Sequence, residues 1–113
     1  MRKGTRLSFY FPEGARHGHH LLHEWLLQTA RDCGIKGGAA FRAIAGFGRH
    51  GHLHYGHFFE EGGRHLPVEV RLVTTPELAE RMLELVRAER VKVFYVKSEV
   101  VYGWVPADLS EDE

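Results

Sequence analysis

The sequence is poor in the features that mark secreted, nucleic-acid-binding and membrane proteins. Its 113 residues include a single cysteine, Cys33, so no internal disulfide can staple the chain. Fifteen lysine and arginine residues balance fifteen acidic residues, which removes the basic field that nucleic acid or an anionic membrane would need. No apolar run is long enough for a signal peptide or a membrane span. We therefore expect a cytoplasmic protein with one core that binds no nucleic acid and is not itself a membrane protein.

Histidine is what the sequence has in excess. Four of the nine histidines lie in RHGHLHYGHFFE, residues 49–60, and another four lie between residues 17 and 23. Because an unperturbed imidazole titrates at about pH 6.5, the charge of this neutral chain depends on pH close to neutrality.

The apolar pattern predicts four strands and two helices. Alternation of Leu7, Phe9 and Phe11 with polar neighbours is typical of a half-buried strand, whereas the nearly continuous apolar run at 39–47 indicates a strand covered on both faces. Thr75 and Pro76 form a helix cap with proline at the first helical position. Strands are predicted over residues 6–11, 39–47, 68–72 and 91–102, the last with a bend or bulge at 97–99, and helices over about 19–33 and from 76 onward.

The order strand, helix, strand, strand, helix, strand predicts an α+β, ferredoxin-like βαββαβ sandwich. Two right-handed crossovers would place both helices on one face of a four-stranded antiparallel sheet. The other face would stay open, yet the strands at 39–47 and 91–102 carry apolar residues on both faces. We expect another copy of the chain to cover it.

Two segments fall outside this plan. Glycine is dense and apolar residues sit singly between about 49 and 66, which predicts a long, mobile loop. The acidic end of the chain, residues 106–113, is predicted to be disordered, which leaves a single domain over residues 1–105.

Three stretches carry a family resemblance: FRAIAGFGRHGHLHYGHFFE, HLPVEVRLV and VKVFYV. From Arg6 to Gly103 the chain resembles the family known as domain of unknown function 190, whose members resemble the PII signal-transduction proteins. The resemblance implies a homotrimer whose sheets face the three-fold axis, with ligand clefts between subunits. It also implies a regulatory role in which the loop over 49–66 docks a partner, with a membrane transporter or channel as a candidate target.

The resemblance implies part of a nucleotide cleft. Gly46 and Gly48, with Phe47 between them, match the strand end that lines the PII cleft, and Lys92 matches the lysine that opens the final strand. The glycine-rich phosphate turn of PII proteins is replaced by VRAERVKV, which contains no glycine, so the ligand stays unknown beyond a nucleotide-like class. Arg42, the one charge in the run at 39–47, either pairs with a carboxylate or faces this cleft and holds an anionic ligand.

The histidines of the loop allow two interpretations. His50, His52 and His54 alternate, so a strand would place them on one face, where two imidazoles can hold Zn²⁺, Ni²⁺ or Cu²⁺. That alternative gives a divalent-metal-binding protein resembling the CutA group. The favoured interpretation is a solvated, partner-contacting surface. Its residues are Arg49, His52, His54, Tyr55 and His57.

A second metal hypothesis concerns the histidines near residue 20. His19 and His23 would lie one turn apart on the first predicted helix and could share an ion. The family has mostly other residue types here, so such a site would be peculiar to this chain.

Little in the sequence suggests catalysis. The only acid–base candidates are Glu60 and Glu61 with His57 or His65, and such pairs arise by chance in any polar loop. We expect that the protein is not an enzyme.

Overall fold

The computed structural model describes residues 1–48, 53–55 and 66–109, with only the backbone for 53–55. Its elements are β1 (Arg2–Pro12), β2 (Arg16–His17), β3 (His20–Leu21), α1 (Leu22–Asp32), β4 (Gly38–Arg42), β5 (Ala45–Phe47), β6 (Leu53–Tyr55), β7 (Pro67–Thr74), α3 (Pro76–Ala88), β8 (Phe94–Tyr102) and the 3₁₀ helix η3 (Ala107–Leu109).

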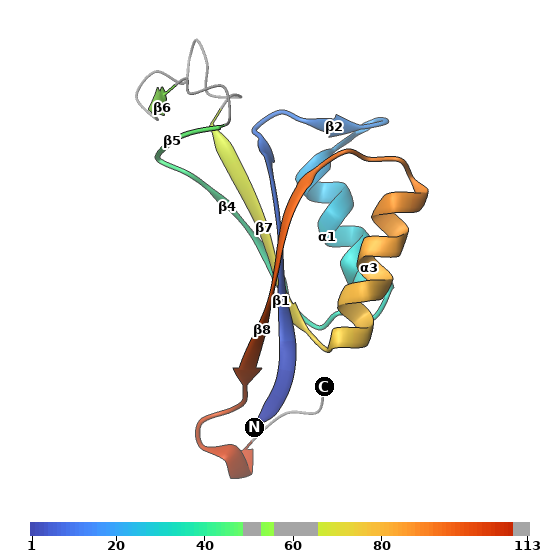
Figure 1. The fold of residues 1–113 in the computed structure, drawn as a ribbon, viewed down its shortest axis with the longest axis vertical. Coiled ribbons are helices and arrows are strands. Elements are labelled where there is room, and N and C mark those ends of the chain that lie inside the picture. Colours follow the sequence, from blue (N-terminus) through green and yellow to red (C-terminus); the bar gives the residue numbers. More distant parts are fainter. Residues whose placement is uncertain (49–52, 56–65, 110–113) are drawn as a thin grey trace.

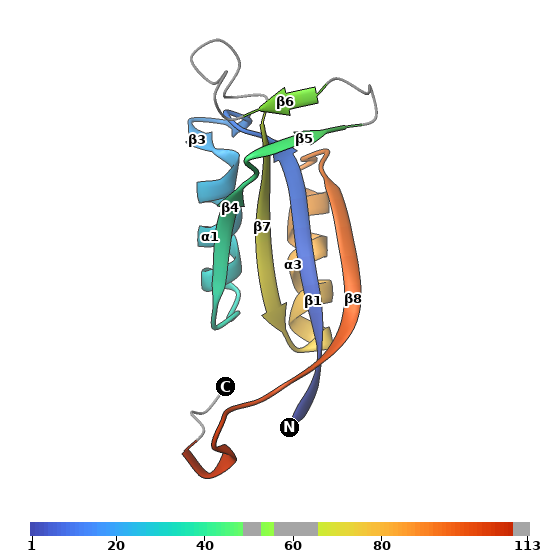
Figure 2. The ribbon, with the colours of Figure 1, turned by 90° about the vertical axis from the view of Figure 1, so that its left-hand side faces the viewer.

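The main sheet has the strand order β4-β7-β1-β8, and every pair is antiparallel. Figure 1 shows α1 and α3 side by side on one face of this sheet, and Figure 2 shows the four strands running alongside one another. The predicted ferredoxin-like α+β fold is therefore confirmed.

The core lies between the sheet and the two helices. Leu7 and Phe9 of β1 and Val70 of β7 are completely buried, and they pack against Leu26 of α1 and Met82 of α3. The alternation that predicted β1 and β7 thus marks the face that the helices cover.

Local signals set the ends of the helices. The hydroxyl of Thr75 accepts a hydrogen bond from the backbone N–H of Leu78 at 3.2 Å, which caps α3 as predicted. Gly34 follows α1 with a φ of 110°, a conformation that glycine adopts without steric cost.

The predicted continuous strand over 39–47 is wrong, because two strands occupy it. β4 follows β7 as far as Arg42, opposite Val68, and a last hydrogen bond joins the N–H of Ala43 to the carbonyl of Pro67 at 2.8 Å. Because β7 begins at Pro67, β4 has no further partner there. The chain turns, and β5 pairs with β6 instead, across the end of the sheet (Figure 2).

Of the bend or bulge predicted at 97–99, the bulge is absent from β8. Its pairing with β1 runs without interruption from Tyr102 opposite Arg2 to Phe94 opposite Tyr10. The apolar pattern of the sequence changes in this strand because Lys97 lies on the helix-covered face, where Glu80 of α3 accepts its hydrogen bond.

The first helix begins later than predicted. Residues 16–21 form a short hairpin of β2 and β3, in which Gly18 has a φ of 61° and the guanidinium of Arg16 donates to the carbonyl of His19 at 2.7 Å. The hairpin uses the local hydrogen-bonding groups that an extra helical turn would need, so α1 starts at Leu22.

The sheet face opposite the helices stays open in one subunit. Phe41 of β4, Val73 of β7 and Phe94 of β8 are exposed on it. We call this surface the open face. It matches the expected apolar face that a second copy would cover.

Candidate functional site

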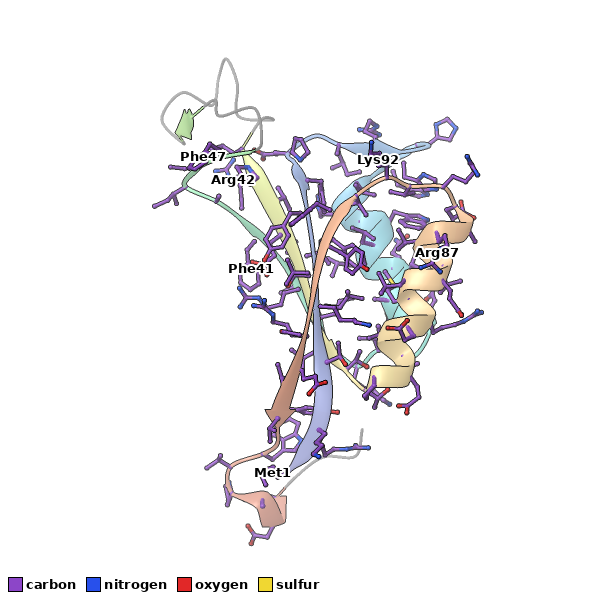
Figure 3. All side chains as sticks on the ribbon, viewed as in Figure 1. Met1, Phe41, Arg42, Phe47, Arg87 and Lys92 are labelled. Atoms are coloured by element: carbon purple, nitrogen blue, oxygen red, sulfur yellow. The ribbon has the colours of Figure 1, made fainter. Side chains whose placement is uncertain are left out.

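Arg42 ends β4, and Gly46 and Phe47 end β5, so the three residues lie at the junction of these strands. Figure 3 shows Arg42 and Phe47 near one another there. The guanidinium of Arg42 pairs with the carboxylate of Glu13 at 3.2 Å, in the turn that follows β1. The first of the two predicted roles of Arg42, pairing with a carboxylate, is therefore seen in the structure. The side chain is half exposed.

Gly46 has a packing role of its own. A Cβ atom at this position would lie 3.0 Å from Cγ of Pro67, closer than ordinary van der Waals contact. Glycine therefore lets β5 cross the start of β7. Phe47 next to it is 67% exposed, and a Cβ on Gly48 would meet no described atom within 4 Å. A large apolar side chain is thus exposed at the junction of β4 and β5.

Lys92 lies at the opposite edge of the sheet. It precedes β8, and β4 and β8 are the two edge strands. Arg42 and Lys92 nevertheless lie at the same end of the sheet, the end at which β1 finishes. Arg42 is opposite Val68, and Phe94, just after Lys92, is opposite Tyr10 near the end of β1. Figure 3 shows Arg42 and Phe47 on one side and Lys92 on the other. One subunit does not bring the predicted cleft residues together.

The end of α3 and the turn to β8 carry two further cations that the sequence interpretation missed. Arg87, in the last turn of α3, and Arg90, in the turn itself, are exposed, and Arg90 has a φ of 59°, which is uncommon for a residue other than glycine. The chain therefore makes here, without glycine, the left-handed turn that glycine usually provides. The spacing Arg-x-x-Arg-x-Lys could have indicated this basic turn.

One contact fixes the start of the basic turn. Nε2 of His17 lies 3.0 Å from Oε1 of Glu89, and the His17 ring meets Trp25 edge-on at 4.6 Å between centroids. The β2–β3 hairpin is thereby tied to the end of α3. Glu89 faces His17, which leaves the three cations of the turn without a carboxylate partner among the contacts of the described residues.

The structure does not support the metal site at His19 and His23. His19 lies in the hairpin and His23 on α1, so they are not one helical turn apart. No group of three histidine, cysteine, aspartate or glutamate side chains in the described part of the chain could hold a metal ion.

Most of the predicted loop residues lie outside the part of the chain that the structure describes. The predictions for Arg49, His50, His52 and His57 all fall there. His54 and Tyr55 are described by their backbone alone, which pairs with Gly46 and Ala45 in the β5–β6 ribbon.

A polar network lies on the open face. Glu69 accepts hydrogen bonds from Arg71 at 3.0 and 3.1 Å, from Ser8 at 2.8 Å and from Tyr10 at 3.3 Å. The bond from Arg71 does most to hold the pKa of Glu69 below its ordinary value, against the opposing effect of burial. The guanidinium of Arg71 also lies over the ring of Phe41, 4.9 Å from its centroid.

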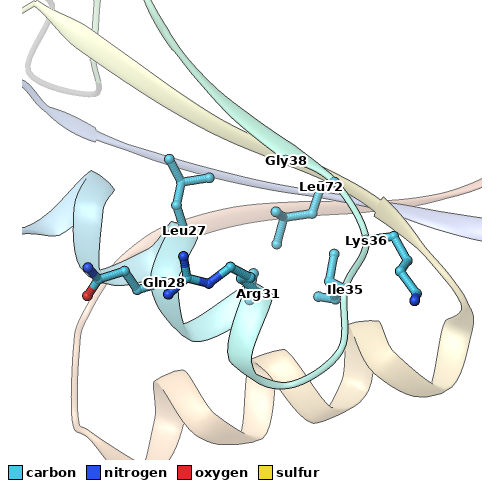
Figure 4. Close-up of a pocket in the computed structure, with 9 residues that line it drawn as sticks. Leu27, Gln28, Arg31, Ile35, Lys36, Gly38 and Leu72 are labelled. Atoms are coloured by element: carbon cyan, nitrogen blue, oxygen red, sulfur yellow. The ribbon is translucent and has the colours of Figure 1, made fainter.

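Two hollows in the described surface lie away from the predicted cleft residues. One, of about 350 Å³, lies between α1 and the start of β4, with Leu27, Ile35 and Leu72 as its apolar lining and Arg31 and Lys36 as its cations (Figure 4). The other, of about 800 Å³, lies between α3 and the far ends of β1 and β8. Neither contains a residue of the predicted cleft.

No helix among the described residues combines the length and the apolar character needed to cross a membrane.

Comparison with known proteins gives a family match and a consistent fold. The family model DUF190, described as Uncharacterized ACR, matches residues 4–101. A UPF0166 protein from Aquifex aeolicus (strain VF5) is 31% identical over 83 residues, which cover 66% of this chain and 78% of that relative.

Solved structures similar to this chain include PII-like proteins. CPII from Thiomonas intermedia K12, a nitrogen regulatory PII-like protein bound to ADP, AMP and bicarbonate, has a TM-score of 0.62 at 17% identity, covering 90% of this chain and 97% of that one. A PII-like signalling protein from Thermus thermophilus has a TM-score of 0.61 at 17% identity, covering 87% of each chain. At these identities the likeness is one of fold.

Proposed function

The chain belongs to the DUF190 family, and from this premise we propose that it is a PII-like regulatory protein that binds a nucleotide-like ligand in clefts between the subunits of a homotrimer. The observation that carries the proposal is the position of the candidate cleft residues. Arg42, Gly46 and Phe47 lie at one edge of the sheet and the basic turn lies at the other edge, at the same end.

A ring of subunits would bring these two edges together. If the β4 edge of one copy faces the β8 edge of the next, Phe47 and Arg42 meet Lys92 and the arginines of the turn across the boundary. Phe47 is exposed and can stack on a base, while the cations of the turn suit phosphate oxygens. CPII, which shares the fold, is bound to ADP and AMP, and this supports a nucleotide as the first ligand to test.

The open face supports the second part of the proposal, the homotrimer. Its exposed aromatic and aliphatic side chains, including Phe41 and Phe94, form a surface that a second and third copy would bury. A homotrimer would also give three equivalent clefts.

Binding of ADP to the wild type and to two matched lysine variants tests the cleft. Lys92→Ala should weaken ADP binding about tenfold, as expected for loss of one charge-assisted hydrogen bond. Lys36→Ala removes an exposed lysine from the other end of the sheet and should leave the affinity unchanged. Equal affinities for both variants in isothermal titration calorimetry would rule out the basic turn as the ligand site.

Mixing two defective variants tests whether the cleft is shared. Trimers assembled from Arg42→Ala and Lys92→Ala subunits contain one cleft with both residues intact, so mixing should restore tight ADP binding that neither variant has alone. If the mixture binds no better than the separate variants, Arg42 and Lys92 do not serve the same cleft.

The loop over 49–66 is the proposed docking element for a partner protein. The β5–β6 ribbon, whose strand β6 belongs to this segment, projects beyond the end of the main sheet (Figure 1). Three copies in a trimer would bind one partner with avidity, and a membrane transporter or channel is the class of target that the family resemblance suggests. The histidines of the loop would make that docking sensitive to pH near neutrality.

A further inference from the structure

A hollow of about 350 Å³ lies between the second half of α1 and the start of β4 (Figure 4). Its volume falls in the range of about 300–1,000 Å³ that is typical of sites for small molecules. β4 begins at Gly38, beside the hollow, and ends at Arg42, beside the candidate cleft. The hollow is therefore separate from the cleft, at the other end of the same strand.

Apolar side chains form the wall of the hollow. Leu27 comes from α1, Ile35 from the connection that follows it, and Leu72 from β7. A Cβ atom on Gly38 would lie 2.5 Å from Cδ2 of Leu72 and 3.3 Å from Cδ2 of Leu27, so glycine lets the backbone of β4 close against this wall. A Cβ on Gly37 would meet no described atom within 4 Å, and β4 is an edge strand. The hollow is thus open at the free edge of the sheet.

The polar groups of the hollow are cationic or neutral. Gln28, Arg31 and Lys36 line it, and none of its described lining residues is acidic. The carboxylate that Arg31 contacts belongs to its neighbour Asp32, with Oδ1 3.5 Å from Nε. The two side chains are 76% and 72% exposed, and an ion pair as exposed as this one is weak. Among the described residues, the two terminal nitrogens of this guanidinium have no partner, so they are available to two oxygens of one carboxylate.

We propose that the hollow binds a small carboxylate that carries an apolar chain. A wholly polar anion such as phosphate would leave the apolar wall in water, and a hydrocarbon would leave the cations unused. Arg31 follows Leu27 by one helical turn, so a carboxylate at its guanidinium can lay its chain along Leu27 and Leu72. In Figure 4, Lys36 lies on the far side of Ile35 from Arg31. The carboxylate is therefore assigned to Arg31.

Backbone ¹H–¹⁵N NMR titrations with butanoate, hexanoate and hexan-1-ol at pH 7 provide the test, with sodium chloride holding the ionic strength constant. Two further methylenes against an apolar wall should make hexanoate bind about tenfold more tightly than butanoate. Hexan-1-ol has the same chain without the charge, and it should bind about tenfold more weakly than hexanoate. Absence of saturable hexanoate binding would overturn the proposal. So would equal affinities for hexanoate and either of the other two compounds.

The position of the shifts and two variants identify the site. The signals that shift with hexanoate should cluster at residues 27–38. Arg31→Gln removes an exposed charge, so it should fold normally and weaken hexanoate binding about tenfold. Arg81→Gln is the matched control, because Arg81 is also an exposed helical residue beside a carboxylate, that of Glu84, yet lines neither described hollow. Equal hexanoate affinities of the two variants would contradict the assignment.

Competition with ADP separates this site from the proposed cleft. Saturating hexanoate should leave the ADP affinity unchanged, and Arg31→Gln should bind ADP as the wild type does, because the two sites lie at opposite ends of β4. If ADP displaces hexanoate, the acid occupies the nucleotide cleft and the proposal is wrong. If hexanoate binds as expected and ADP does not bind at all, the proposed cleft is wrong and the carboxylate site is supported.

Discussion

The two faces of the sheet carry similar residue types in very different environments. Phe9 on the helix-covered face is completely buried, whereas Phe94, which opens the neighbouring strand, is 67% exposed on the open face. The helix-covered face is purely apolar at its centre, but the open face holds Glu69, Arg71 and Arg6 among its aromatic side chains.

This difference indicates that the two faces have different roles. The buried face stabilises the subunit through continuous apolar packing. The open face contributes less to the subunit but presents an apolar surface with defined charges, a combination typical of association surfaces. Substitutions on the two faces should therefore affect different measurements.

Phe9→Ala is expected to cause the largest loss of folding stability. The cavity it leaves between the sheet and helices should lower the free energy of unfolding by about 3–5 kcal/mol. Chemical denaturation followed by circular dichroism measures this loss. A loss no larger than that of Phe94→Ala would contradict the assignment of the two faces.

Phe94→Ala should affect assembly more than folding. Its ring is exposed in the subunit and contacts Tyr10 at 6.0 Å between centroids, so the secondary structure should persist. If the open face is buried between copies, losing about 1.4 kcal/mol there weakens association about tenfold. Light scattering over a range of concentrations measures the change, and a wild type that is monomeric at every concentration would refute the proposed trimer.

Glu69→Gln should lower the free energy of unfolding by an intermediate amount that depends on pH. The folded-state pKa of Glu69 lies below its ordinary value of about 4.5, so its stabilisation is present above that value and is lost as the pH falls through the folded-state pKa. At pH 7 the variant should lose about 1–2 kcal/mol through weaker hydrogen bonds to the uncharged amide.

The difference in the free energy of unfolding between wild type and Glu69→Gln should narrow as the pH falls below the ordinary value of about 4.5. Glu99→Gln is the control, because Glu99 is an exposed strand residue on the other face. Thermal unfolding at a series of pH values measures both. A gap that stays constant with pH would show that the charge of Glu69 does not stabilise the fold.

The smallest effect on stability is expected from replacing His52 and His54 together with alanine. Substitutions away from a core usually change stability by less than about 0.5 kcal/mol, so unfolding should be nearly unchanged while binding of a partner weakens. Chemical denaturation measures the stability of wild type and the double variant, and partner pull-down from the same preparations measures their binding. If the trimer unfolds and binding by the refolded fraction is unchanged, these histidines are structural.

The sequence was sufficient for the fold because its local signals are strong. Alternation in β1 and β7, the Thr75 cap and the glycine after α1 each depend on residues close together in the chain. The positions of the elements could therefore be predicted without knowledge of their neighbours. The late start of α1 was missed, because the β2–β3 hairpin competes with the helix for the same backbone groups.

The site could be predicted only in part. Lys92, Arg42 and Gly46 were named from the sequence, but their distribution over opposite edges depends on strand order, which joins residues far apart in the chain. Arg87 and Arg90 were missed because an arginine in a left-handed conformation leaves no glycine to signal the turn.

By itself, then, the sequence determined the type and order of the two helices and of the four strands of the main sheet, since short-range periodicity and capping act within a few residues. Only the tertiary structure decided that the run at 39–47 breaks where β7 begins at Pro67, because a strand continues only as far as its partner does. The tertiary structure likewise decided that the carboxylate of Glu69 accepts hydrogen bonds, whereas the buried Nε of Arg6 makes none with a described residue. Both are charged residues in alternating strands, and they differ because strand register puts three donors around Glu69 and no described carboxylate beside Arg6.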